Sequence, residues 1–317
     1  MKLKKIMAAI TTFALTFGMY TSIPKAVQSN TFDSVNEISS LFKIEPFSVS
    51  DASSLRRPCS SETPMWIIHI DSWNYADPAK IIDLIPEDVL PYCVFNISLS
   101  INWDNTNHQW LMIQDGYECA KSWIKTCADK GVWTMIQPAS GGQCHFPDYD
   151  SNGNIINFPN KGQFVANDGN DLENSVFAEF FRDYPNFIGY NYCEQFWGFA
   201  SQDFPITYQQ RYQHFAKLLE LCNKYGGYLN ISVCENQWGT ALNPIGLLKQ
   251  VPEWNQACCK YSENLILEEK YTQHSYIADI ESEVYGAYIA GYCGNYGVRW
   301  DDTGWSDDPW SENPTKN

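Results

Sequence analysis

The chain has 317 residues and a net charge of −16, with 37 acidic and 21 basic side chains. This balance argues against a nucleic-acid partner, because phosphate backbones are bound by clusters of Lys and Arg, and the sequence has none after its basic first residues. Aromatic residues make up 15% of the chain, and many lie beside Asn, Gln, Asp or Gly, so we expect some of these rings to line a groove and most to pack in the core.

The first residues combine a basic start with a short apolar run from Ile6 to Tyr20, which is typical of a secretory signal. We expect cleavage near Ala26, so that residues 1–26 are a signal peptide and the product is secreted; a retained N-terminal anchor is the alternative. No later stretch approaches the length of a membrane helix, so no membrane insertion is expected after cleavage. Residues 27–54 are polar and rich in Ser, which is typical of a linker or leader.

From residue 55 onward, short β-rich apolar runs alternate with amphipathic segments. Parallel strands that are buried on both faces form apolar runs of this kind, so the alternation predicts an α/β fold with a parallel sheet. The expected strands are 65–71, 92–100, 132–138, 187–194, 228–235, 265–269 and 297–301, and the expected helices are 78–85, 117–130, 175–184, 208–225 and 276–290.

Asp71, Ser72 and Trp73 follow the first expected strand, where a dinucleotide-binding fold would carry a Gly-rich loop. The pattern therefore favours a (β/α)8 TIM-type barrel over an open, doubly wound sheet. Functional residues of such barrels lie at the carboxyl ends of the strands. Polar residues recur at those ends, at Asp71, Gln137, Glu194, Glu235, Glu268, Glu269, Asp301 and Asp302. Only seven strands are predicted, so the domain at 55–317 is expected to be an incomplete barrel that lacks its eighth strand.

Glu194 ends an apolar strand and has aromatic neighbours on both sides, in the run FIGYNYCEQFWGF at 187–199. Burial against apolar rings disfavours the charged carboxylate and raises its pKa, which is the condition that a general acid needs near neutral pH. Aromatic rings around an acid also suit the faces of sugars. The alternative is a structural carboxylate that pairs with a nearby cation.

The chain contains 11 Cys, an odd number, so at least one Cys lacks a partner within the chain. Three of them, Cys93, Cys193 and Cys234, lie in expected strands and are interpreted as small buried hydrophobic residues. The connectivity of any disulfides stays open. The spacing of Cys and His suggests no zinc or other metal site, and the sequence signals no cofactor.

Beyond these patterns, the chain resembles the catalytic module of glycoside hydrolase family 98. The resemblance covers about residues 55–305. It is carried by the run around Glu194 and by the stretches RRP at 56–58, PMWIIHIDSWNY at 64–75, DLIPED at 83–88, FNISLS at 95–100, QPASGG at 137–142, RDYPNF at 182–187 and GYCGNYGVRWD at 291–301.

The resemblance implies a secreted, endo-acting glycosidase that inverts the anomeric centre, with Glu194 as general acid and Asp301 as base. It also implies either an endo-β-1,4-galactosidase acting on blood-group A or B glycans or an endo-β-1,4-xylanase. A second base-side carboxylate of the family lies on a following strand that this sequence does not reach. We therefore expect a chain truncated at its C-terminus. Asp302 stays open as the alternative base, and a structural pair of Asp301 with Arg299 is the other possibility.

Several further residues are candidates for sugar contacts, because a pyranose is bound by a ring face together with hydrogen-bonding groups. His145 lies in a loop, whereas His69 lies in an apolar strand where a buried core histidine is the competing interpretation. Tyr192 and Trp197 flank the proposed acid. The candidate substrate-binding residues are His69, Asp71, Trp73, Asn74, Gln137, His145, Tyr192, Trp197 and Glu235.

Two other functions compete with the inverting hydrolase. One is an inactive glycan-binding remnant of such an enzyme, and the other is a retaining glycosidase that pairs Glu194 with a different nucleophile. All three take an oligosaccharide or polysaccharide as partner. The sequence does not choose between galactoside and xyloside.

Overall fold

The computed structural model describes residues 43–45, 54–71, 77–98, 101–104, 109–112, 116–138, 172–195, 208–234, 248–271 and 280–300. The chain divides into two units, Met1–Ile38 and Ser39–Asn317, and every described residue belongs to the second. Within these ranges, no helix has the length and apolar character needed to cross a membrane.

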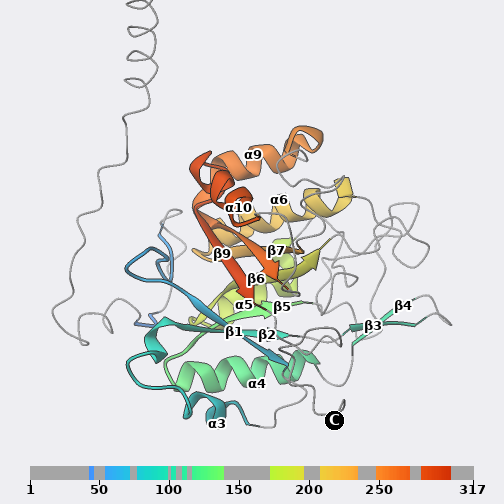
Figure 1. The fold of residues 1–317 in the computed structure, drawn as a ribbon. Coiled ribbons are helices and arrows are strands. Elements are labelled where there is room, and N and C mark those ends of the chain that lie inside the picture. The colour runs from blue at the N-terminus through green and yellow to red at the C-terminus, as the bar shows by residue number, and fades with distance from the viewer. Residues whose placement is uncertain are drawn as a thin grey trace, which may run out of the picture. The chain divides into compact units, whose positions relative to one another are not determined.

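Seven parallel strands form one sheet in the order β1-β2-β5-β6-β7-β8-β9, and the sheet curls into a half-barrel (Figure 1). This confirms the predicted parallel sheet and its seven strands. The order of the strands in the sheet is their order in the chain, as expected when each crossover places the next strand beside the previous one. The strands are β1 (Trp66–Asp71), β2 (Cys93–Ser98), β5 (Trp133–Gln137), β6 (Phe187–Gln195), β7 (Tyr228–Cys234), β8 (Leu265–Tyr271) and β9 (Asn295–Trp300).

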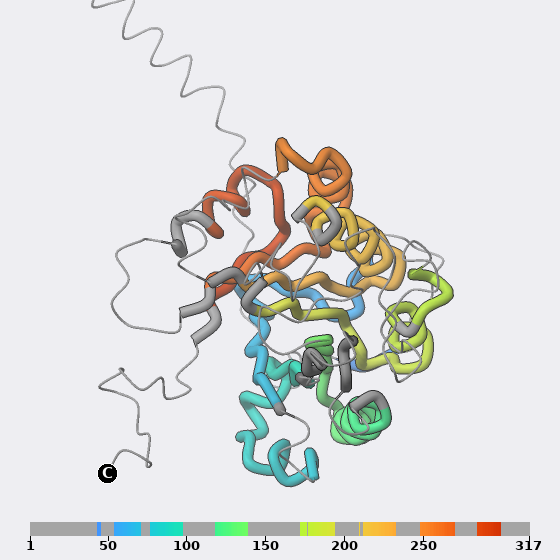
Figure 2. Tube along the Cα trace, turned by 90° about the vertical axis from the view of Figure 1, so that its right-hand side faces the viewer, coloured from blue at the N-terminus to red at the C-terminus, as the bar shows by residue number. Residues whose placement is uncertain are grey.

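Helices cover the outer face of the sheet. In the view of Figure 2, α4 lies below the strands, and α6 and α9 lie above them. The helices are α3 (Pro78–Ile82), α4 (Gly116–Asp129), α5 (Val176–Asp183), α6 (Tyr208–Lys224), α9 (Pro252–Tyr261) and α10 (Ile280–Ile289), with short 3-10 turns at η1 (Leu90–Tyr92), η2 (Leu172–Asn174) and η3 (Ser262–Asn264).

Helix α9 and the strands β3 (Ile101–Asp104) and β4 (Gln109–Met112) were not predicted from the sequence. Helix α9 begins with Pro252 at its first turn and buries Trp254, Ala257 and Cys258 at helical spacing. The strands β3 and β4 pair antiparallel and form a separate two-stranded sheet.

The two faces of the main sheet bury different sets of side chains, because successive residues of a strand point to opposite faces. Phe95, Tyr190 and Leu229 belong to the larger core, which lies between the sheet and the helices. The inner face of the half-barrel carries a smaller cluster made by Val94, Trp133, Met135, Ile188, Tyr228 and Ile266. These two alternating sets define which residues of each strand face the inside of the barrel.

The strand cysteines fit the interpretation as small apolar residues. Cys93 and Cys193 are buried in β2 and β6, whereas the side chain of Cys234 lies outside the described part. Elsewhere in the core, burial raises the pKa of the Cys127 thiol to about 12, so this sulfur stays protonated at neutral pH.

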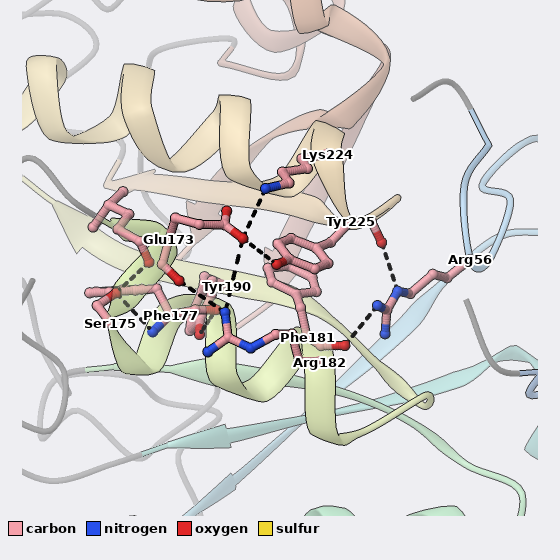
Figure 3. A network of polar contacts seen from close by, with 10 residues as sticks. Arg56, Glu173, Ser175, Phe177, Phe181, Arg182, Tyr190, Lys224 and Tyr225 are labelled. Carbon is pink, nitrogen blue, oxygen red and sulfur yellow. Dashed lines mark hydrogen bonds and ion pairs between the residues drawn. The ribbon is translucent and has the colours of Figure 1, made fainter. Parts of the chain in front are cut away.

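Arg56 lies at the amino-terminal ends of β6 and β7. Its guanidinium donates hydrogen bonds to the backbone oxygens of Tyr225 at 2.7 Å and Phe181 at 2.8 Å (Figure 3). It also donates to the backbone oxygens of Tyr184 and Phe187, both at 3.1 Å. Burial lowers its pKa to about 10, which leaves the group charged at neutral pH. These bonds connect α5, the start of β6 and the turn before β7 at the end of the sheet opposite to the carboxyl ends of the strands.

Gly189 allows β6 and β7 to lie close together. Its φ is +141°, and a Cβ atom at this position would lie 1.9 Å from the carbonyl oxygen of Tyr228. We therefore expect Gly189→Ala to lower the free energy of unfolding by about 3 kcal/mol or more, through strain and displacement of β7. Urea unfolding followed by fluorescence measures the change.

Gly286→Ala is the matched control for Gly189→Ala. Gly286 lies in α10, and a Cβ atom there would meet nothing within 4 Å. Because Ala is the better helix former, this substitution is expected to leave stability unchanged or to raise it by up to about 1 kcal/mol. Equal unfolding midpoints for the two variants would contradict the close approach at Gly189.

Candidate active site

Glu194 is the penultimate residue of β6, at the carboxyl end of the sheet. The pairing of β6 with β7 shifts between Tyr192 and Gln195: Tyr192 is level with Ile231, and Gln195 with Val233. Strand β6 therefore advances by three residues where β7 advances by two. The extra residue of β6, Cys193 or Glu194, forms a β-bulge. Such bulges bend a strand and change the direction of a side chain, and they are frequent next to active sites. The surroundings of the Glu194 carboxyl lie outside the described part, so its raised pKa stays a prediction.

A polar chain crosses the inner face near the carboxyl ends of β1, β2 and β5. Asn96 of β2 is fully buried and lies between His69 of β1 and Gln137 of β5. Its amide nitrogen is 3.2 Å from His69 Nδ1 and donates a hydrogen bond of 3.3 Å to Gln137 Oε1. Gln137 is also buried, but His69 is exposed, so it is not a buried core histidine. The structure thus brings together two predicted substrate-binding residues through a third that was not predicted.

The middle of the inner face carries two more buried amides, Asn191 of β6 and Asn230 of β7, which are level in the sheet. Among the described residues, the Oδ1 atom of Asn191 and both amide atoms of Asn230 have no hydrogen-bond partner, as is also true of Asn96 Oδ1. Leaving a buried polar atom unsatisfied costs about 1–3 kcal/mol. Such atoms in a native core are usually explained by function or by ordered water.

Glu268 of β8 places a carboxylate on the same face. It accepts a hydrogen bond of 2.6 Å from the Ser232 hydroxyl of β7, and it is only 7% exposed. Gly297 of β9 is level with it, and a Cβ atom there would lie 3.1 Å from Glu268 Cγ and 3.3 Å from Oε1. Because glycine has no side chain, the carboxylate of Glu268 fits beside β9 at this position.

Tyr192 and Glu269 lie on the opposite, helix-covered face. The Tyr192 hydroxyl is 3.1 Å from His214 Nε2 of α6, and its ring packs edge-on against Phe215. Glu269 is fully buried and follows Glu268 by one position, so it points away from the inner face. Substrate binding by Tyr192 stays a prediction, and the contacts that the structure gives this residue are structural.

The remaining predicted residues are less fully described. Asp71 is the last residue of β1, and its side chain lies outside the described part. Asp301 comes directly after Trp300, the last residue of β9. Like Asp301, the predicted residues Trp73, Asn74, His145, Trp197, Glu235 and Asp302 lie outside the described ranges.

Sequence reasoning missed Asn96, Asn191, Asn230 and Ser232. Their signal was present, since each is a polar residue inside a strand that is otherwise apolar, and Asn230 and Ser232 share one face by their spacing. In the ranges that the structure describes, no group of three or more His, Cys, Asp or Glu side chains is placed to hold a metal ion. The described polar atoms of the inner face thus include amides, hydroxyls, an imidazole and a carboxylate, the groups that hydrogen-bond to sugar hydroxyls.

Residues 53–313 match the sequence profile described as "Glycosyl hydrolase family 98". The chain belongs to glycosyl hydrolase family 98. This match spans the whole half-barrel and both predicted catalytic carboxylates. None of the curated proteins matches the chain.

Solved structures of family 98 share this fold. The catalytic module of a family 98 glycoside hydrolase from Streptococcus pneumoniae TIGR4, in complex with the H-disaccharide blood group antigen, has a TM-score of 0.53 at 19% identity and covers 80% of this chain. The same module with the LewisY pentasaccharide has a TM-score of 0.52 at 18% identity, and in its native form 0.51 at 19%. The chain spans about 40% of the length of these solved chains. At this identity the likeness shows the fold, an incomplete (β/α)8 barrel.

Proposed function

We propose that this chain is a secreted, endo-acting glycoside hydrolase that cleaves β-1,4 linkages with inversion, with Glu194 as general acid and Asp301 as base. The observation that carries the proposal is the position of Glu194 at the bulged carboxyl end of β6, within a chain that belongs to family 98. Secretion rests on the signal-like sequence of residues 1–26.

The order of the strands supports the pairing of Glu194 with Asp301. Strand β6 is separated from β9 by β7 and β8, so three strand spacings lie between them, about 14 Å along the curled sheet. An inverting pair needs its carboxyl groups about 6.5–9.5 Å apart. Side chains that extended inward from the two strand ends would shorten the backbone separation toward that range. A gap of that size holds the sugar linkage and the attacking water.

In this mechanism the Glu194 carboxyl donates its proton to the departing glycosidic oxygen, and the Asp301 carboxylate takes a proton from water on the opposite face of the sugar. The water oxygen forms the new bond to the anomeric carbon while the old bond breaks. On the inner face, the exposed imidazole of His69 is suited to bind a sugar hydroxyl, and the buried amides of Asn96 and Gln137 support it. The predicted contacts at Asp71, Trp73 and Asn74 would add the face of one aromatic ring and further hydrogen-bonding groups.

Blood-group glycans are the favoured substrates. The pneumococcal modules whose fold this chain shares were solved with the H-disaccharide and with the LewisY pentasaccharide. Both ligands are blood-group antigens, which supports a substrate of that class over xylan for this chain. Neither ligand places a demand on the sign of the protein charge, so a net charge of −16 is compatible with them.

The proposed activity is tested by incubating the full chain with blood-group A and B oligosaccharides and, separately, with xylan, while new reducing ends are measured. We expect reducing ends from the blood-group glycans. Release from xylan alone would assign the chain to the xylanase type. Binding of both glycans without any product would contradict the enzyme and leave the glycan-binding protein as the function.

A further inference from the structure

Asn96 has no contact with solvent, yet it holds an exposed residue of the candidate site. It is 0% exposed on β2, whereas His69, level with it on β1, is exposed. The Asn96 amide nitrogen carries two hydrogens, and it has two neighbours on this face, Gln137 Oε1 at 3.3 Å and His69 Nδ1 at 3.2 Å. The amide group therefore has one N–H for each neighbour.

The orientation of this amide follows from its neighbour on β5. The Gln137 oxygen is only an acceptor, so it requires a donor from Asn96. Turning the Asn96 amide over alone would place its Oδ1 against Gln137 Oε1, and two acceptors at this distance repel, so the two amides keep complementary orientations. With the nitrogen on this side, the group facing His69 Nδ1 is also an N–H, because one NH₂ group makes both contacts.

We propose that Asn96 is a positioning residue that fixes the tautomer of His69, with Nδ1 as acceptor and the ring proton on Nε2. A neutral imidazole has one N–H, and the hydrogen bond made by one ring nitrogen decides which nitrogen carries it. With this tautomer, Nε2 is the atom through which the His69 ring can donate, and in the proposed function a sugar oxygen is the acceptor. The role in sugar binding rests on the proposed function, whereas the tautomer does not.

The first test measures the tautomer in the full chain without glycan. It uses ¹⁵N NMR of the imidazole nitrogens, recorded under alkaline conditions so that the rings are neutral. The chain has five His, so His69→Gln identifies the signals of His69 by their loss. We expect a protonated Nε2 and an unprotonated Nδ1. A protonated Nδ1 would overturn the proposal whatever the chain does with glycans.

The second test is Asn96→Asp, which keeps the shape of the side chain but replaces its donors by acceptors. A carboxylate at this position accepts from Nδ1–H, so the ring proton is expected to move to Nδ1. Binding of a blood-group oligosaccharide should weaken about fivefold, the effect of one lost hydrogen bond. An unchanged Nε2–H spectrum in the folded variant would contradict the positioning role.

Asn230→Asp is the matched control for the tautomer spectrum. Asn230 is equally buried on the same face, but it lies on β7 and has no bond to His69. This variant also adds a buried carboxylate, and we expect the His69 signals to keep the wild-type pattern. If neither Asp variant folds, the spectrum of the unaltered chain decides the proposal. Failure of every glycan to bind would sink the proposed function and leave the tautomer assignment standing.

Discussion

Glu194→Gln is expected to lower the rate of glycan hydrolysis by about 10²–10⁴-fold while glycan binding is retained. Gln keeps the shape of the side chain but has no proton to give to the departing oxygen. The rate is measured as reducing ends released from a blood-group oligosaccharide, and binding is measured by calorimetry. Glu220→Gln, an exposed position on α6, is the control and should behave like the unaltered chain.

An activated substrate separates the loss of a proton donor from damage to the fold. An aryl glycoside with an acidic phenol departs without protonation, so Glu194→Gln should hydrolyse it nearly as fast as the unaltered chain. The unaltered chain should lose activity on natural glycans as the pH rises through the pKa of Glu194, because the acid form is the active one. This alkaline decline should vanish in the variant with the activated substrate. Near-normal turnover of a natural glycan by the variant would remove Glu194 from the mechanism.

Asp301→Asn is expected to lower hydrolysis by about 10²–10⁴-fold, on natural and activated substrates alike. The base activates water in both cases, so a better leaving group does not replace it. The neighbouring Asp302→Asn is the matched control, since alternation along an extended chain turns adjacent side chains in opposite directions. It should keep activity within a few-fold of the unaltered chain. The opposite pattern in the two variants would assign the base to Asp302.

The sequence predicts the seven-stranded sheet because each buried parallel strand is a run of apolar residues with clear ends. The expected strand 132–138, for example, is observed as β5 (Trp133–Gln137). The same pattern does not reveal helix α9, because its buried apolar residues are few and lie among polar neighbours. They are Trp254, Ala257 and Cys258. Helix ends are also hard to place, as shown by the helix expected at 78–85, which ends at Ile82 in the structure.

The site is only partly predictable, because its geometry depends on how strands align. Residue order alone places Glu194 at the end of β6, but the bulge beside it depends on the pairing of β6 with β7. In the same way, the contacts of Asn96 depend on the register of β1, β2 and β5, which are far apart in the chain. A polar residue in an apolar strand is visible in the sequence, whereas its partner is set by the fold.

We propose that Glu194 and Asp301 hydrolyse a glycosidic bond with a single inversion. ¹H NMR of the first product, recorded before the anomers of the new reducing end equilibrate, tests it most directly. Cleavage of a β-1,4 linkage should give the α-anomer first, because water attacks from the face opposite to the departing oxygen. Initial release of the β-anomer would mean a covalent intermediate and would contradict a single inversion by Glu194 and Asp301.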